Sequence, residues 1–128
     1  MNISQAAQAS GLSAKMIRDY EKMGLIPSAK RSENGYRRYD ENDVALLQFI
    51  RRAREVDFSL AETAELLRLW QDPQRTSAAV KAITANHIAM LDQKIARLSA
   101  MRDTLRGWHT DCCGDQRPEC AILDGLLS

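Results

Sequence analysis

The chain has 128 residues, of which 45% are hydrophobic and 27% are charged, and its formal net charge is +1. This length allows one compact domain with an appendage, and the composition is typical of an ordered, soluble protein. No apolar run approaches the ~20 residues of a membrane span, and no signal peptide is evident. We therefore expect a cytoplasmic protein with no membrane partner.

Charge is distributed unevenly along the chain. Residues 12–38 hold seven basic and three acidic side chains, a net charge of +4. Residues 108–128 hold one basic and four acidic side chains, a net charge of −3. The chain therefore has a basic N-terminal part and an acidic C-terminal part, which the net charge alone conceals.

The first two predicted helices form a helix-turn-helix. Residues 3–10 are expected to be helical, with Ser4 as the N-cap and Gly11 at the end. Ser13 is the expected N-cap of a second helix over residues 14–23. Two helices joined by a short glycine-containing turn match the helix-turn-helix pattern, although other two-helix corners look similar.

An arginine-rich hairpin is predicted directly after the second helix. Asn34-Gly35 is a strong signal for a tight turn, since both residues tolerate positive φ. A hairpin carrying guanidinium groups beside a basic helix indicates a winged helix-turn-helix, in which the helix enters the major groove and the wing holds phosphates. The alternative is a solvated hairpin with incidental arginines. The predicted DNA-binding residues are Lys15, Arg18, Tyr20, Arg31, Tyr36, Arg37, Arg38 and, as a phosphate contact, Arg54.

Two more helices are predicted before a break. One covers residues 41–54 with Asp40 as its N-cap. The other starts at Ser59, which forms a capping box with Glu62, and runs to about Trp70. We expect Trp70 to be buried. A following Asp-Pro pair ends this helix.

A long helix is predicted over residues 77–107, which contain no proline. Apolar residues spaced 3, 4, 3 and 7 apart form a heptad seam: Ile88, Leu91, Ile95, Leu98 and Leu105. Such a helix is roughly 45 Å long and needs a partner for its apolar stripe. We expect a two-chain coiled coil, the alternative being one helix folded back onto its own domain.

Three cysteines lie within nine residues of one another near the C-terminus. In a reducing compartment they indicate metal or redox chemistry rather than a disulfide. Cys112 and Cys120 flank a loop that can place two thiolates about one soft monovalent ion, and a helix over residues 121–127 would point its positive end at the site. The alternatives are Cys113 as a replacement ligand, a four-ligand zinc site that adds His109, and unliganded thiols.

Several segments carry a resemblance to a known family. They are ISQAA at 3–7, MIRDYE at 16–21, GLI at 24–26, RSENGYR at 31–37 and RRAR at 51–54. Together they resemble the MerR family of transcriptional regulators, over the whole chain. DPQR at 72–75, Ser77, Lys81 and the Cys-x7-Cys loop resemble its copper-efflux (CueR-like) branch, from whose pattern Cys113 departs.

The resemblance implies a mainly helical fold with four parts. These are a winged helix-turn-helix DNA-binding domain at 1–70, a hinge at 71–76, an antiparallel coiled-coil dimerisation helix at 77–107, and a metal-binding loop with a terminal helix at 108–128. Cys112 and Cys120 are implied to bind one Cu(I), Ag(I) or Au(I) per chain, with Lys81 near the site. The resemblance also implies that relatives which sense divalent metals have a cysteine at the position of Ser77.

The implied function is that of a non-enzymatic, metal-responsive activator. It binds double-stranded promoter DNA as a homodimer and works with RNA polymerase by distorting that DNA. Two alternatives within the family are a zinc or other divalent-metal sensor and a thiol redox-sensing regulator. A metallochaperone would explain the cysteines but leaves the basic N-terminal part without a role.

Overall fold

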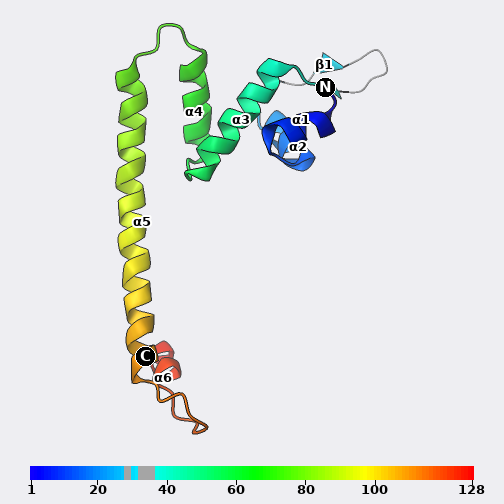
Figure 1. Ribbon diagram of the computed structural model, residues 1–128. Coiled ribbons are helices and arrows are strands. Elements are labelled where there is room, and N and C mark those ends of the chain that lie inside the picture. Colours follow the sequence, from blue (N-terminus) through cyan, green and yellow to red (C-terminus); the bar gives the residue numbers. More distant parts are fainter. Residues whose placement is uncertain (28–29, 32–36) are drawn as a thin grey trace. The chain divides into compact units, whose positions relative to one another are not determined.

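The computed structural model describes residues 1–27, 30–31 and 37–128 (Figure 1). The described chain is mainly helical, as predicted. Its elements in order are α1 (Ile3–Ser10), α2 (Ala14–Lys22), β1 (Lys30–Arg31), β2 (Arg37–Arg38), α3 (Glu41–Glu55), α4 (Leu60–Gln71), α5 (Ser77–Asp111) and α6 (Ala121–Leu127). The chain forms two compact units, Met1–Ile83 and Thr84–Ser128. Among the described residues, no helix is both long and apolar enough to cross a membrane.

Side-chain caps fix the starts of three helices as predicted. Ser13, Asp40 and Ser59 each accept a hydrogen bond from the amide three residues later, at 3.1, 2.8 and 3.0 Å. The capping box between Ser59 and Glu62 is closed by a second bond of 2.9 Å. Gly11 ends α1 in the left-handed conformation, with φ of 79°, which glycine adopts without steric cost.

The start of α1 differs from the prediction. Asn2, not Ser4, is its N-cap, and the Asn2 side chain accepts from the Gln5 amide at 2.9 Å. The Gln5 side chain accepts in return from the Asn2 amide at 2.9 Å. Ser4 already lies inside the first turn, so its hydroxyl cannot serve as the cap that precedes the helix.

The first unit has one hydrophobic core built from α1 to α4 and the base of the hairpin. Its buried members are Ala6, Leu12, Ile17, Tyr20, Ile26, Tyr39, Leu46, Leu47, Ile50 and Leu67. Tyr39 lies directly after β2, and its hydroxyl donates to the Glu21 carboxylate of α2 at 2.5 Å. This bond ties the base of the hairpin to the second helix of the helix-turn-helix.

The hairpin is antiparallel, with Lys30 opposite Arg38 and Arg31 opposite Arg37. This pairing confirms the hairpin that the sequence predicts after the second helix. The predicted turn at Asn34-Gly35 and the predicted contact Tyr36 lie outside the described residues.

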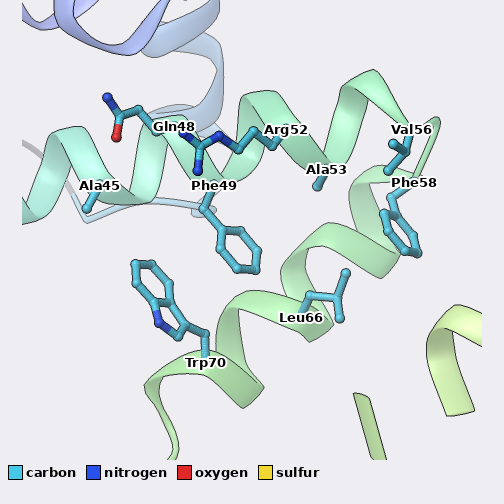
Figure 2. A pocket seen from close by; sticks show the side chains of 9 residues that line it. All are labelled: Ala45, Gln48, Phe49, Arg52, Ala53, Val56, Phe58, Leu66 and Trp70. Carbon is cyan, nitrogen blue, oxygen red and sulfur yellow. The ribbon is translucent and has the colours of Figure 1, made fainter. Parts of the chain in front are cut away.

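Trp70 is 40% exposed, so the expectation that it is buried is wrong. Its indole stacks on the Phe49 ring of α3, with ring centroids 5.0 Å apart and an interplanar angle of 5°. Figure 2 shows this pair beside a pocket of about 480 Å³ between α3 and α4. The residues that line this pocket are mostly apolar, and Trp70 is one of them, so part of its side chain faces the open space.

α5 is 35 residues long, about 52 Å, and it extends four residues beyond the predicted end at 107. Four of its five predicted seam residues are more than half exposed on the single chain: Ile88, Ile95, Leu98 and Leu105. An uncovered apolar stripe on a long helix is typical of a dimerisation surface.

Candidate metal centre

Two of the three cysteines face each other at the start and end of one loop. Cys112 directly follows α5, and its backbone N–H donates to the Trp108 carbonyl at 3.1 Å. Cys120 is the N-cap residue of α6. Their Sγ atoms lie 3.7 Å apart, and both side chains are partly buried. Cys113 is exposed and does not take part in this pair.

The loop between the two thiols is folded by its own polar side chains. The Arg117 backbone N–H donates to Asp115 Oδ1 at 2.9 Å, and its guanidinium donates to Oδ2 at 2.8 Å. Gly114 adopts a left-handed φ of 63°, which turns the chain directly after Cys113. These local contacts fold the loop back on itself, which is how an eight-residue separation in sequence becomes a 3.7 Å separation of sulfurs.

The surroundings of Cys120 favour its thiolate. The backbone N–H of Leu123, at the start of α6, lowers the pKa of Cys120 most, followed by the thiol of Cys112. The Ile122 N–H acts in the same direction, while partial burial and the Asp124 carboxylate oppose the shift. The N–H groups of the first turn of α6 thus face the sulfur, although none closes a capping hydrogen bond of standard geometry. Only the thiolate form binds metal, so the lowered pKa of Cys120 favours this residue as a metal ligand.

The pair is the right distance apart to hold one metal ion. With a metal–sulfur distance of about 2.3 Å, sulfurs 3.7 Å apart subtend an angle close to tetrahedral. A linear arrangement needs sulfurs about 4.6 Å apart, about 0.9 Å more than the observed separation. Rotation of the two side chains can supply that change, because Cys112 and Cys120 border an exposed loop. The donor set fits a soft metal, and the spacing alone permits both geometries.

The number of ligands restricts the choice of metal ion more than the spacing of the two sulfurs does. Within the described part of the chain, no group of three or more His, Cys, Asp or Glu side chains is placed to hold a metal ion. His109 and Cys113 are therefore not gathered with the thiol pair, and one chain does not assemble the four-ligand zinc site considered from the sequence.

Ser77 and Lys81 lie at the other end of α5 from the cysteines. Both are exposed, and with Arg75 they line a hollow of about 630 Å³. Ser77 is the first residue of α5, whereas Cys112 directly follows the last, so Ser77 and Lys81 belong to the first compact unit and the thiol pair to the second.

The predicted DNA-binding residues divide into two groups. Lys15 and Arg18 are exposed on α2, and Arg38 is exposed on β2 of the hairpin. Arg54 is exposed on α3, and its Nη1 donates to the Phe58 carbonyl at 2.7 Å. Tyr20 is only 5% exposed and belongs to the core, which favours a packing role over the predicted DNA contact.

Two residues that the sequence analysis did not single out form a contact between α6 and the end of α5. Trp108 and Gly125 lie against each other so closely that a side chain at Gly125 would overlap the indole. The only signal in the sequence was a glycine inside a short apolar helix, where glycine is normally disfavoured.

Family models and known proteins match this architecture. Residues 1–70 match a model described as MerR HTH family regulatory protein, and residues 44–108 match one described as MerR, DNA binding. A probable heavy metal-dependent transcriptional regulator of Haemophilus influenzae is 54% identical, over 98% of each chain. The regulator CueR of Salmonella typhi is 44% identical, over 98% of this chain and 91% of its own. A lead(II)-bound transcription regulator of Ralstonia metallidurans has a TM-score of 0.83 at 34% identity, over 98% of each chain.

Proposed function

The chain belongs to the MerR family of transcriptional regulators, and we propose that it senses Cu(I), Ag(I) or Au(I) and activates a metal-efflux or detoxification promoter. Proteins of this family are DNA-binding regulators, which confirms that the chain is not an enzyme. The observation that carries the proposal is the pair of facing thiols, Cys112 and Cys120, beside which the described residues place no third ligand.

Two thiolates without further ligands suit a soft monovalent ion better than zinc. A d10 monovalent ion is satisfied by two soft donors, whereas zinc normally takes four ligands. The described residues of one chain offer the thiol pair and no third ligand beside it. The 44% identity to a CueR protein supports the same assignment.

A second copy completes the proposed site. A monovalent ion held by two thiolates carries a net charge of −1, which is costly to bury without a nearby cation. In an antiparallel dimer the start of the partner's α5 would approach the loop, with Lys81 as the cation. Ser77 supplies no thiolate there, so the site stays short of the ligands that a divalent ion needs.

The output of the sensor is proposed to be DNA distortion. Bending a site of 20–30 bp costs about 1–6 kcal/mol, and reversing a 1:99 equilibrium to 99:1 requires about 5.5 kcal/mol of differential binding. Metal binding supplies a bias of that size when the activating form of the regulator binds the metal about 10⁴-fold more tightly than the inactive form. A dimer with one winged helix-turn-helix per chain would hold a dyad-symmetric promoter in the form that RNA polymerase uses.

We propose that α6 transmits the free-energy bias that metal binding supplies. Leu123, Leu126 and Leu127 are 58%, 65% and 85% exposed on the single chain. Metal binding at Cys120 orders the residue that begins α6, so it can fix the orientation of these leucines. They would then dock against helices of the same dimer.

One observation favours a second candidate, a divalent-metal sensor. The 3.7 Å sulfur separation suits a tetrahedral ion without adjustment, and a related regulator was solved with lead(II). Such a sensor would need further ligands from the second copy. Ser77 disfavours this candidate, because a serine stands where the resemblance implies an extra cysteine ligand in divalent-metal sensors.

Anaerobic titration with Cu(I) against a competing chelator tests the proposal. Cys112→Ser, Cys120→Ser and Cys113→Ser are titrated in parallel, and Zn²⁺ serves as the comparison ion. We expect one Cu(I) per chain, lost in the first two variants and retained in the third. Tighter binding of Zn²⁺, or equal loss in all three variants, would overturn the monovalent assignment.

A further inference from the structure

α6 contacts the end of α5 through a glycine that lies flat against a tryptophan. A Cβ built at Gly125 would lie 2.5 Å from Nε1 and 2.7 Å from Cδ2 of the Trp108 indole, and closer still to Cε2. Real Cβ atoms do not approach other atoms so closely. The indole therefore occupies the space that any other residue at position 125 would need (Figure 1 shows α6 beside the end of α5).

The contact joins the two short segments of the chain that carry the thiols. In residues 106–128 the partly buried residues are Trp108, Cys112, Cys120, Ala121, Ile122 and Gly125. The Trp108 carbonyl accepts from the Cys112 amide, so the tryptophan lies one helical turn before the first thiol. Gly125 lies in the helix that Cys120 caps. Trp108 and Gly125 thus connect the two short segments that carry the sulfurs.

We propose that Trp108 and Gly125 are positioning residues for the thiol pair. The indole against the glycine sets how α6 lies on α5, and this placement brings Cys120 opposite Cys112. Neither residue contacts the metal. The effect of these residues on metal affinity rests on the proposed function. Their effect on the spacing of the two thiols is a property of the metal-free protein.

Substituting Gly125 by alanine separates this role from helix propensity. Alanine is the better helix former, so propensity alone predicts a better ordered α6. The positioning role predicts the reverse, because α6 must move by roughly 1 Å to restore ordinary contact with the indole. Gly107→Ala is the matched control, since Gly107 lies within α5 next to Trp108 and nothing lies within 4 Å of its built Cβ.

The first readout uses the metal-free protein with Cys113→Ser, so that only the pair under study remains. Diamide oxidises the two thiols to a Cys112–Cys120 disulfide and takes up their two protons and two electrons as a hydrazine. We expect Gly125→Ala to slow this reaction at least fivefold and Gly107→Ala to leave it within twofold. Equal rates in the parent, Gly125→Ala and Gly107→Ala would overturn the proposal.

The second readout is Cu(I) affinity, measured by chelator competition in the same variants. It is also measured in Trp108→Leu with and without Gly125→Ala. We expect Gly125→Ala to weaken binding at least fivefold in the presence of Trp108. The substitution should have less than a twofold effect in a Trp108→Leu background, where the smaller side chain leaves room for the methyl group. An undiminished effect in that background would contradict the contact. A parent that binds no Cu(I) would instead refute the proposed function, and the diamide rates would still decide the positioning role.

Discussion

Arg117 and Asp115 close a clamp inside the loop that separates the two facing thiols. The Arg117 guanidinium and its backbone N–H both donate to the Asp115 carboxylate, at 2.8 and 2.9 Å. The side-chain bond is the main reason that the pKa of Asp115 is lowered, with the backbone bond next. The clamp lies on the surface, so it acts on the loop's shape rather than on the stability of the fold.

Breaking the clamp is expected to weaken metal binding modestly. Asp115→Asn and Arg117→Gln should each lower Cu(I) affinity by roughly two- to fivefold, because exposed ion pairs contribute little. The double variant should be no worse than either single variant, since both remove the same contact. Chelator competition measures the three affinities. Additive losses would mean that the two residues act independently.

The thiol of Cys120 is expected to ionise at lower pH in the folded protein than in a peptide of residues 116–124. The N–H of Leu123 and the Cys112 thiol stabilise the thiolate and lower the pKa of Cys120 from its ordinary value of 9.0. Folding therefore gains stability from this group above pH 9.0 and loses it as the pH falls through the lowered pKa. The pH midpoint of iodoacetamide alkylation at Cys120, read by peptide mass spectrometry, measures the shift. An equal midpoint in the peptide would contradict it.

Lys15 and Arg18 are expected to contribute to DNA affinity through their exposed positions on α2. If a side chain contacts a phosphate, its substitution by alanine should reduce the slope of log K against log salt by about 1. If it reads a base edge, affinity should fall by about 1–3 kcal/mol mainly for the preferred sequence. Titration of the promoter at several salt concentrations separates the two cases. Arg97→Ala, which removes one exposed charge from α5, is the control and should change neither quantity.

Tyr20 is expected to support the core of the first unit rather than to contact DNA. Tyr20→Ala should destabilise that unit by about 3–5 kcal/mol, because it empties a buried aromatic site. Tyr20→Phe keeps the ring and should leave DNA affinity within about twofold. Urea denaturation and promoter binding give the two values. A stable Tyr20→Ala variant with lost DNA binding would restore the sequence-based assignment.

The exposed leucines of α6 are expected to separate metal binding from activation. Leu123→Ser and Leu126→Ser change side chains that are 58% and 65% exposed, so Cu(I) affinity should stay within about twofold. Transcription from the metal-responsive promoter in vitro should fall at least tenfold at saturating Cu(I), if these leucines dock as proposed. Full activation by both variants would exclude α6 as the transmitting element.

Features that depend on local spacing were determined by the sequence alone. The caps at Ser13, Asp40 and Ser59 each join a side chain to an amide three residues away, so the motif contains both partners. The apolar heptad of α5 predicted a long helix for the same reason, since its period follows from the helix itself. The family motifs of residues 1–70 are also contiguous, and the family model confirms them.

Features that depend on how elements pack were decided only by the tertiary structure. Tyr20 and Trp70 are aromatic residues on amphipathic helices, and only the packing of neighbouring helices buries the first and exposes part of the second. The contact between Trp108 and Gly125 joins residues 17 positions apart, which no periodic pattern relates. The cysteines depend on both local sequence and packing. The sequence identified two thiols and a loop between them, while the fold of that loop and the placement of α6 set the sulfurs 3.7 Å apart. Local hydrogen bonds are encoded by neighbours, whereas the distance between two side chains across elements depends on the volumes that pack between them.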